Sequence, residues 1–147
     1  PSPETLAEAD LDGLGITGAR IAAIRGFAAA VAGGAVRLDG SVGLDDLTAS
    51  IVAVRGLGPW TAGYIALRLG ERDAFPATDL GLIRAAAALA GAAGAVGSDG
   101  TAGSDGRVAL GRWSDGWRPW RALAAVHLWR ADPTGPPTAA APRSVPA

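Results

Sequence analysis

The residues of this chain that could do chemistry gather between positions 52 and 82, and the most prominent feature among them is a glycine turn. Gly56 and Gly58 bracket one apolar residue, and Pro59 suits the first position of a helix because its missing N–H is not needed there. Such a turn exposes backbone N–H groups at a helix N-terminus, which can bind an anion such as a phosphodiester without any basic side chain. The alternative is a helical corner with no ligand, and the glycines alone do not decide between the two.

Asp79 follows a proline-containing bend and opens a predicted helix. A carboxylate at this place is typical of a helix N-cap, since it accepts hydrogen bonds from backbone N–H groups and faces the positive end of the helix dipole. Thr78 could take the same role. From the residues alone, capping is the favoured interpretation of Asp79.

Helices must position these residues. Apolar residues at steps of three and four predict one helix that enters the glycine turn and another that leaves it. They are Leu44, Leu47, Ile51 and Val54 before the turn, and Ala62, Ile65, Ala66 and Leu69 after it. Further helices are predicted over about 21–31, 80–90 and 117–129, and no convincing strand alternation occurs. The sequence therefore predicts an all-α fold organised around a helix, hairpin, helix unit.

Length and composition limit the class of protein. The 147 residues suit one domain, and a net charge of −1 argues against an ordinary basic nucleic-acid binder. The absence of cysteine excludes disulfides, cysteine-ligated zinc and cysteine-bound iron–sulfur clusters. Residues 91–106 have the composition of a flexible glycine-rich loop, and residues 132–147 that of a disordered proline- and alanine-rich tail.

No apolar run approaches the roughly 20 residues that span a bilayer, and no signal peptide is visible. We therefore expect a cytoplasmic protein with no membrane partner. We also expect a monomer.

Two segments, 56–64 and 75–79, together resemble the helix-hairpin-helix DNA glycosylase superfamily, and within it the AlkA-like DNA-3-methyladenine glycosylase II family. Residues 112–113 and 117–121, continuing to 127–129, resemble the last long helix of that family. The resemblance covers most of residues 1–131 and implies a helix-hairpin-helix glycosylase domain over that range.

The resemblance implies a catalytic role for Asp79, which matches the aspartate of the superfamily. A fixed negative charge stabilises the positive charge that builds on the sugar when an N-glycosidic bond breaks, and it can orient or deprotonate the attacking water. Trp60, Tyr64 and Trp129 match aromatic residues of the family's base pocket. Their rings suit a positively charged alkylated purine that has left the duplex stack.

The resemblance also assigns the hairpin to damaged duplex DNA. The expected DNA-binding residues are Arg55, Gly56, Leu57, Gly58 and Thr61. Members of the superfamily often hold a monovalent cation at the hairpin, and the matching ligands would be the backbone carbonyls of Val52, Val54 and Leu57. We expect no other cofactor beyond such a structural Na⁺ or K⁺. Arg55 departs from the proline common in relatives, and its charge could add a phosphate contact.

Trp60 occupies the position of the lysine nucleophile of the bifunctional glycosylase-lyases, and the chain has no lysine: all thirteen basic residues are arginine. Monofunctional hydrolysis without a lyase step is therefore expected. The resemblance implies that the substrate is an alkylated purine such as 3-methyladenine, excised after base flipping in base excision repair. The alternatives are a non-catalytic helix-hairpin-helix DNA-binding module or a degenerate glycosylase, and a helical interaction domain without nucleic acid. Relatives carry further helices and a mixed α/β domain before the segment that matches Ser2, so we expect upstream helices to be missing here.

Overall fold

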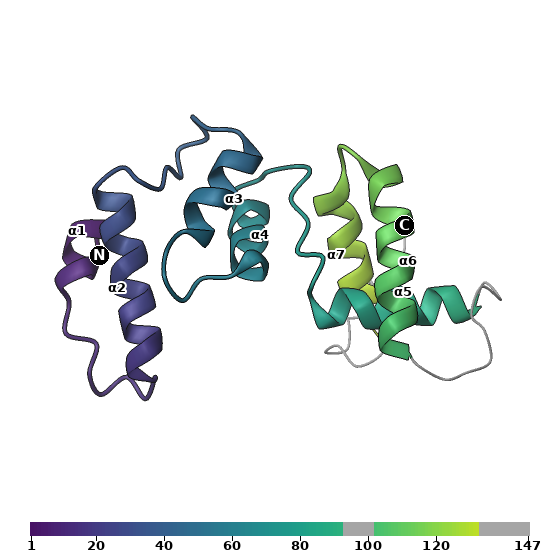
Figure 1. Ribbon diagram of the computed structural model, residues 1–147, viewed down its shortest axis with the longest axis horizontal. Helices are drawn as coiled ribbons and strands as arrows, with labels where there is room; N and C mark the ends of the chain where they lie inside the picture. Colours follow the sequence, from purple (N-terminus) through teal and green to yellow (C-terminus); the bar gives the residue numbers. More distant parts are fainter. Residues whose placement is uncertain (93–101, 133–147) are drawn as a thin grey trace, which may run out of the picture. The chain divides into compact units, whose positions relative to one another are not determined.

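The computed structural model describes residues 1–92 and 102–132, and every regular element in these ranges is a helix (Figure 1). The elements are α1 (Pro3–Glu8), α2 (Gly18–Ala32), α3 (Leu44–Val52), α4 (Pro59–Arg68), α5 (Leu80–Ala92), α6 (Ala102–Ser114), the short 3₁₀ helix η1 (Asp115–Trp117) and α7 (Arg121–Ala131). The all-α prediction is confirmed. The chain divides into two compact units, Pro1–Pro76 and Ala77–Ala147, which are described separately.

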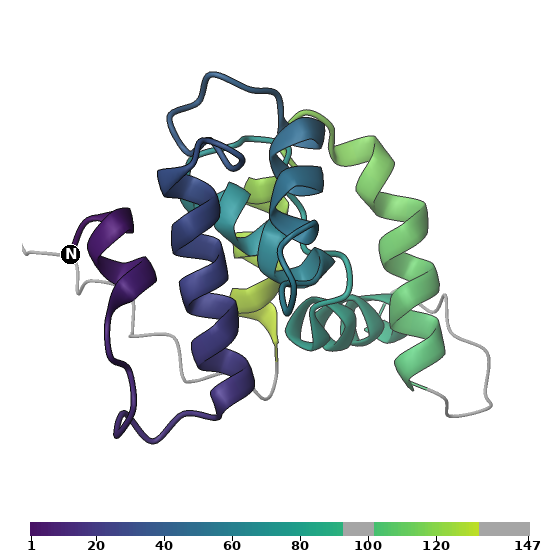
Figure 2. The ribbon, with the colours of Figure 1, turned by 60° about the vertical axis from the view of Figure 1, so that its left-hand side comes forward.

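In the first unit, α1 packs along α2 (Figure 2). Both helices begin at residues that suit a helix start. The hydroxyl of Ser2 accepts a hydrogen bond from the N–H of Thr5 at 3.3 Å, and Thr17 caps α2 in the same way. Arg25 of α2 then donates through Nε to the carbonyl of Ala9 at 2.9 Å. This contact ties the residue that ends α1 to the side of α2.

The hairpin helices α3 and α4 form the core of the first unit. Their buried side chains are Leu47, Ile51, Ala62 and Ala66, joined by Val36 and Ala74 from the flanking loops. The two buried alanines lie one turn apart on α4, so that the apolar face of α3 can approach closely. The helical stripes that the sequence predicts on either side of the turn are therefore the surfaces that meet, except at Leu69, which follows α4 and is 45% exposed.

The second unit is built on α5, against which α6 and α7 pack. Its buried residues are mostly small, with alanines at three positions of α5 and single alanines on α6 and α7. The approach of α6 is so close that a Cβ atom on Gly106 would overlap the carbonyl oxygen of Ile83. A glycine is therefore required at this crossing.

Two sequence predictions need correction in the second unit. Residues 91–92 and 102–106, predicted as loop, form the end of α5 and the start of α6. The small residues that favour a loop also permit the close contact at Gly106. The single last helix predicted over 117–129 is replaced by η1 and by α7, which begins after Pro119, a residue that cannot continue a helix. Residues 93–101 and 133–147 lie outside the described residues, but Asp132, predicted as the first residue of the tail, is part of the structure.

None of the described helices is long and apolar enough to cross a membrane.

Candidate functional site

The hairpin between α3 and α4 is a tight turn held by its own backbone. The N–H of Val54 donates to the carbonyl of Ile51 at 3.1 Å, and the N–H of Leu57 donates to the carbonyl of Val54 at 3.1 Å. Gly58 then serves as the N-cap of α4 and, lacking a side chain, makes no side-chain cap hydrogen bond. The first turn of α4 thus presents backbone N–H groups that no capping side chain covers, as the anion-site prediction requires.

The two glycines of the turn have different reasons to be glycine. Gly56 has a φ of +92°, and a Cβ atom on it would lie 3.0 Å from the Cβ of Ala23 on α2. Gly58 has an ordinary φ of −112°, and a Cβ atom on it would meet nothing within 4 Å. Gly56 is therefore required by the fold, whereas the fold leaves Gly58 open to a ligand that approaches the backbone closely.

We expect Gly56→Ala and Gly58→Ala to separate folding from binding. Gly56→Ala should lower the free energy of unfolding by about 1–3 kcal/mol, because it strains a positive φ and crowds Ala23. Gly58→Ala should cost no more than about 1 kcal/mol as an N-cap change, yet weaken duplex binding. Urea unfolding and fluorescence-anisotropy titration with a DNA duplex would measure both quantities. Unchanged duplex affinity in Gly58→Ala would remove the turn from the DNA-binding surface.

The other predicted hairpin residues differ in what they expose. Arg55 is exposed, and Thr61 is half-buried. The side chain of Leu57 is half-buried and packs against the core of the first unit. The carbonyl of Val54 already accepts the N–H of Leu57, which leaves it one lone pair for a cation. Val52 ends α3, where helical carbonyls lack intrahelical partners. The carbonyls of Val52 and Val54 therefore keep acceptor capacity, and the cation stays a prediction.

Trp60 and Tyr64 lie one turn apart on α4 and stack on each other. Their ring centroids are 5.6 Å apart with an interplanar angle of 9°, and the two residues are 44% and 37% exposed. Between them on the same helix, Gly63 is buried against Pro76, whose Cα would lie 3.2 Å from a Cβ on that glycine. The stack is therefore a partly exposed aromatic surface on the helix that the hairpin opens.

Asp79 caps α5, as the residues alone predict, and it also contacts a second predicted site residue. Its Oδ1 accepts a hydrogen bond from the N–H of Leu82 at 3.0 Å and another from the indole Nε1–H of Trp129 at 2.8 Å. Two N–H donors on one carboxylate oxygen fix the direction of the carboxylate. The structure therefore brings the predicted catalytic acid and one predicted pocket aromatic into direct contact.

Three further residues surround this pair, and the sequence pattern does not identify them. Gly81 is buried below it: a Cβ there would lie 3.0 Å from Asp79 Oδ1, 3.1 Å from Asp132 Oδ2 and 3.2 Å from Trp129 Cδ1. Asp132 forms an ion pair with Arg84, with Nη2 and Oδ2 2.7 Å apart. The only sequence signal for this cluster is the helical spacing of Gly81 and Arg84 after Asp79. Such spacing is too common to identify a cluster of side chains.

The predicted site residues thus form two groups. Asp79 and Trp129 belong to the second unit, and the Trp60–Tyr64 stack and the hairpin belong to the first. That the two groups act on one nucleotide stays a prediction.

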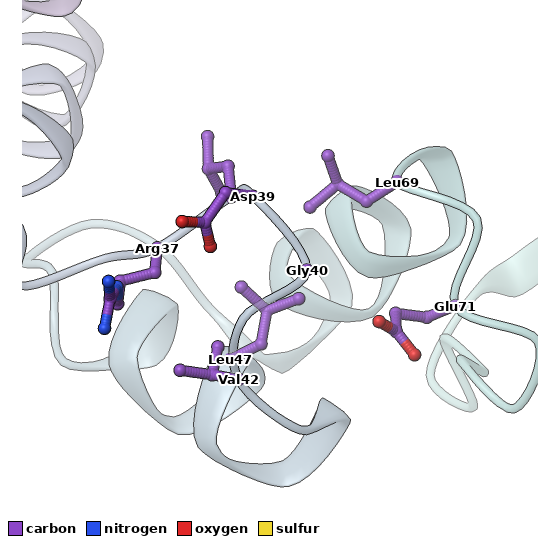
Figure 3. Close-up of a pocket in the computed structure, with 8 residues that line it drawn as sticks. Arg37, Asp39, Gly40, Val42, Leu47, Leu69 and Glu71 are labelled. Atoms are coloured by element: carbon purple, nitrogen blue, oxygen red, sulfur yellow. The ribbon is translucent and has the colours of Figure 1, made fainter.

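The first unit also contains a hollow of about 230 Å³ beside α3 and the end of α4 (Figure 3). Leu38, Val42, Leu47 and Leu69 give it an apolar lining, while Arg37, Asp39 and Glu71 provide its charges. Ser41 donates hydrogen bonds from its hydroxyl and its N–H to Asp39, and these lower the pKa of that carboxyl. None of the predicted site residues lines this hollow, so it is separate from the candidate site.

Comparison with known proteins supports the resemblance. The chain is 41% identical over 130 residues to the probable bifunctional transcriptional activator/DNA repair enzyme AlkA of Mycobacterium tuberculosis, in strains H37Rv and CDC 1551; the match covers 88% of this chain and 24% of that protein. It is 30% identical over 86 residues to the DNA-3-methyladenine glycosylase of Bacillus subtilis, which covers 58% of this chain and 25% of that protein. The chain therefore spans about a quarter of the length of these relatives.

A solved structure has the same fold. The Schizosaccharomyces pombe 3-methyladenine DNA glycosylase Mag1, in complex with abasic DNA, matches with a TM-score of 0.68 and 21% sequence identity, covering 88% of this chain and 62% of Mag1. No protein-family model matches the chain. The predicted all-α fold matches that of Mag1, and the predicted similarity of the sequence to AlkA is confirmed.

Proposed function

We propose that this chain carries the base-excising part of a DNA-3-methyladenine glycosylase, which binds damaged duplex DNA, extrudes an alkylated purine nucleotide and hydrolyses its N-glycosidic bond. The observation that carries the proposal is the hydrogen bond from Trp129 to Asp79, which fixes a carboxylate beside an aromatic ring. The DNA-repair names of its relatives support the same conclusion.

Each group has a distinct task in the proposed reaction. The backbone at Gly58 and the first turn of α4 bind a phosphate, with Arg55 as an additional cation. The exposed Trp60–Tyr64 stack attracts the positively charged base. The ionised carboxylate of Asp79 stabilises the positive charge that develops on the sugar and orients the attacking water.

The proposed reaction is hydrolysis without a lyase step. A lyase of this fold needs an amine nucleophile, and the chain contains no lysine. Trp60 stands at the position of that nucleophile and instead takes part in the aromatic stack. Water is therefore the nucleophile in the proposed mechanism.

A DNA-binding module that does not cut is the second candidate function, and one observation favours it. Capping of α5 by itself gives Asp79 a structural reason to be present. In this alternative the chain binds duplex DNA and releases no base.

Release of free base from a methylated duplex tests the proposal. We expect Trp60→Ala or Tyr64→Ala to slow the release of a cationic lesion such as 3-methyladenine by about 10-fold, because a ring that attracts the charge is removed. Tyr64→Phe keeps the ring and should remain within about 2-fold, since the hydroxyl contributes little to the attraction. In the two alanine variants, release of the neutral purine hypoxanthine should change less than release of cationic 3-methyladenine. Duplex binding without any base release by the unmodified chain would support the module instead.

A further inference from the structure

The Arg84–Asp132 ion pair adjoins the Asp79–Trp129 hydrogen bond, and the proposed reaction gives it no role. Asp132 is the residue that ends α7, and its N–H donates to the carbonyl of Trp129 at 3.4 Å. Its side chain is 6% exposed, and Arg84 contacts both carboxylate oxygens, through Nη2 at 2.7 Å and Nε at 3.3 Å. A nearly buried carboxylate that accepts two hydrogen bonds from one guanidinium, from Nε and from Nη2, has a fixed position.

The geometry around Gly81 couples this ion pair to Asp79. One carboxylate oxygen of Asp79, one of Asp132 and the ring of Trp129 all lie within 3.2 Å of the point where a Cβ on Gly81 would be. The three side chains thus converge on the same glycine, on the first turn of α5. A side chain larger than that of glycine at this position would disturb all three.

We propose that the Arg84–Asp132 pair is a positioning device, which fastens the end of α7 to α5 and so holds the indole N–H of Trp129 on Asp79. Trp129 and Asp132 belong to the last turn of α7, and helix ends open readily unless they are fastened. Arg84 supplies the fastening from α5, the helix that Asp79 caps. The effect of this ion pair on catalysis rests on the proposed function, whereas its effect on the position of Trp129 does not.

The positive charge of Arg84 also acts on the carboxylates of Asp132 and Asp79. Hydrogen bonding to Asp132 raises the pKa of Arg84, and the negative charge of Asp79 raises it further. Arg84 therefore interacts favourably with both carboxylates, which would otherwise repel each other.

NMR spectroscopy of the indole N–H groups tests this positioning role directly. Arg84→Gln and Asp132→Asn should each shift the Nε1–H resonance of Trp129 and accelerate its exchange with solvent by about 10-fold, because the last turn of α7 opens more often. The double variant should show no larger effect than the stronger of the two single variants, because each substitution breaks the same Arg84–Asp132 contact. Arg84→Lys keeps the charge without the two-armed contact and should give an intermediate exchange rate.

The chain offers a matched control in the exposed ion pair of Arg118 and Asp115, whose closest atoms are 3.7 Å apart. Arg118→Gln and Asp115→Asn should leave the Trp129 resonance and its exchange rate unchanged. If Arg84→Gln and Asp132→Asn lower the melting temperature but leave that resonance in place, the pair only stabilises the fold and the proposal is wrong.

Base-release kinetics add the catalytic consequence. Arg84→Gln should reduce kcat by about 10-fold with little change in KM, because the carboxylate is misdirected while the surface that binds DNA stays intact. An unmodified chain that releases no base would refute the proposed function, while the NMR result would still decide the positioning role.

Discussion

Replacing Asp79 by Asn is expected to reduce the rate of base release by about 10²–10³-fold, because the substitution removes a fixed negative charge from a site where positive charge develops. The structure makes this substitution unusually informative. Asn caps helices about as well as Asp, and its carbonyl oxygen can accept from both the N–H of Leu82 and the indole of Trp129. The charge is thus removed while both hydrogen bonds are kept.

Asp79→Ala provides the contrast. It should lower the free energy of unfolding by about 2–4 kcal/mol, because α5 loses its cap and the Trp129 N–H loses its acceptor. Single-turnover release from a methylated duplex, together with urea unfolding, would separate the two effects. If Asp79→Asn releases base within about 3-fold of the unmodified rate, the carboxylate is only a cap. Asp79→Asn should bind the duplex no more weakly than the unmodified chain, since it removes a negative charge that repels the phosphates of DNA.

The hairpin can be predicted from sequence because its signals are local. Periodic apolar residues fix the facing surfaces of α3 and α4, and Pro59 fixes where α4 begins. The capping role of Asp79 is local too, since it depends only on a carboxylate before a helix. The different duties of Gly56 and Gly58 are not predictable, because the contact that requires Gly56 comes from Ala23, far away in the chain.

The rest of the candidate site depends on contacts between distant segments. The hydrogen bond from Trp129 to Asp79 and the ion pair from Arg84 to Asp132 join residues about 50 positions apart, with separations of 50 and 48. A sequence pattern assigns Trp129 to an aromatic class but not to a hydrogen-bond partner. The sequence places Asp132 in the tail because the prolines that follow it dominate the local composition. Tertiary contacts override such local signals.

The same difference between local and tertiary signals explains why the sequence predicts a loop where α6 begins. It also predicts that two glycine-to-alanine substitutions in α6 change the free energy of unfolding in opposite directions. Gly106 and Gly111 both lie in α6, where glycine has low helix propensity. A Cβ on Gly111 would meet nothing within 4 Å, so Gly111→Ala should raise the free energy of unfolding by about 0.5–1 kcal/mol. A Cβ on Gly106 would overlap the backbone of Ile83, so Gly106→Ala should lower it by about 2–4 kcal/mol by forcing α6 away from α5.

A Trp60→Phe background makes this test specific to the second unit. Trp60 is the only tryptophan of the first unit, so in its absence the tryptophan fluorescence reports on the second unit alone. Urea unfolding of the two alanine variants in this background should move the midpoint in opposite directions. Equal shifts of the same sign would mean that helix propensity alone governs α6. Moving α6 away from α5 should also disturb the candidate site. Gly106 packs against α5, which is the helix that Asp79 caps and that Arg84 joins to the end of α7.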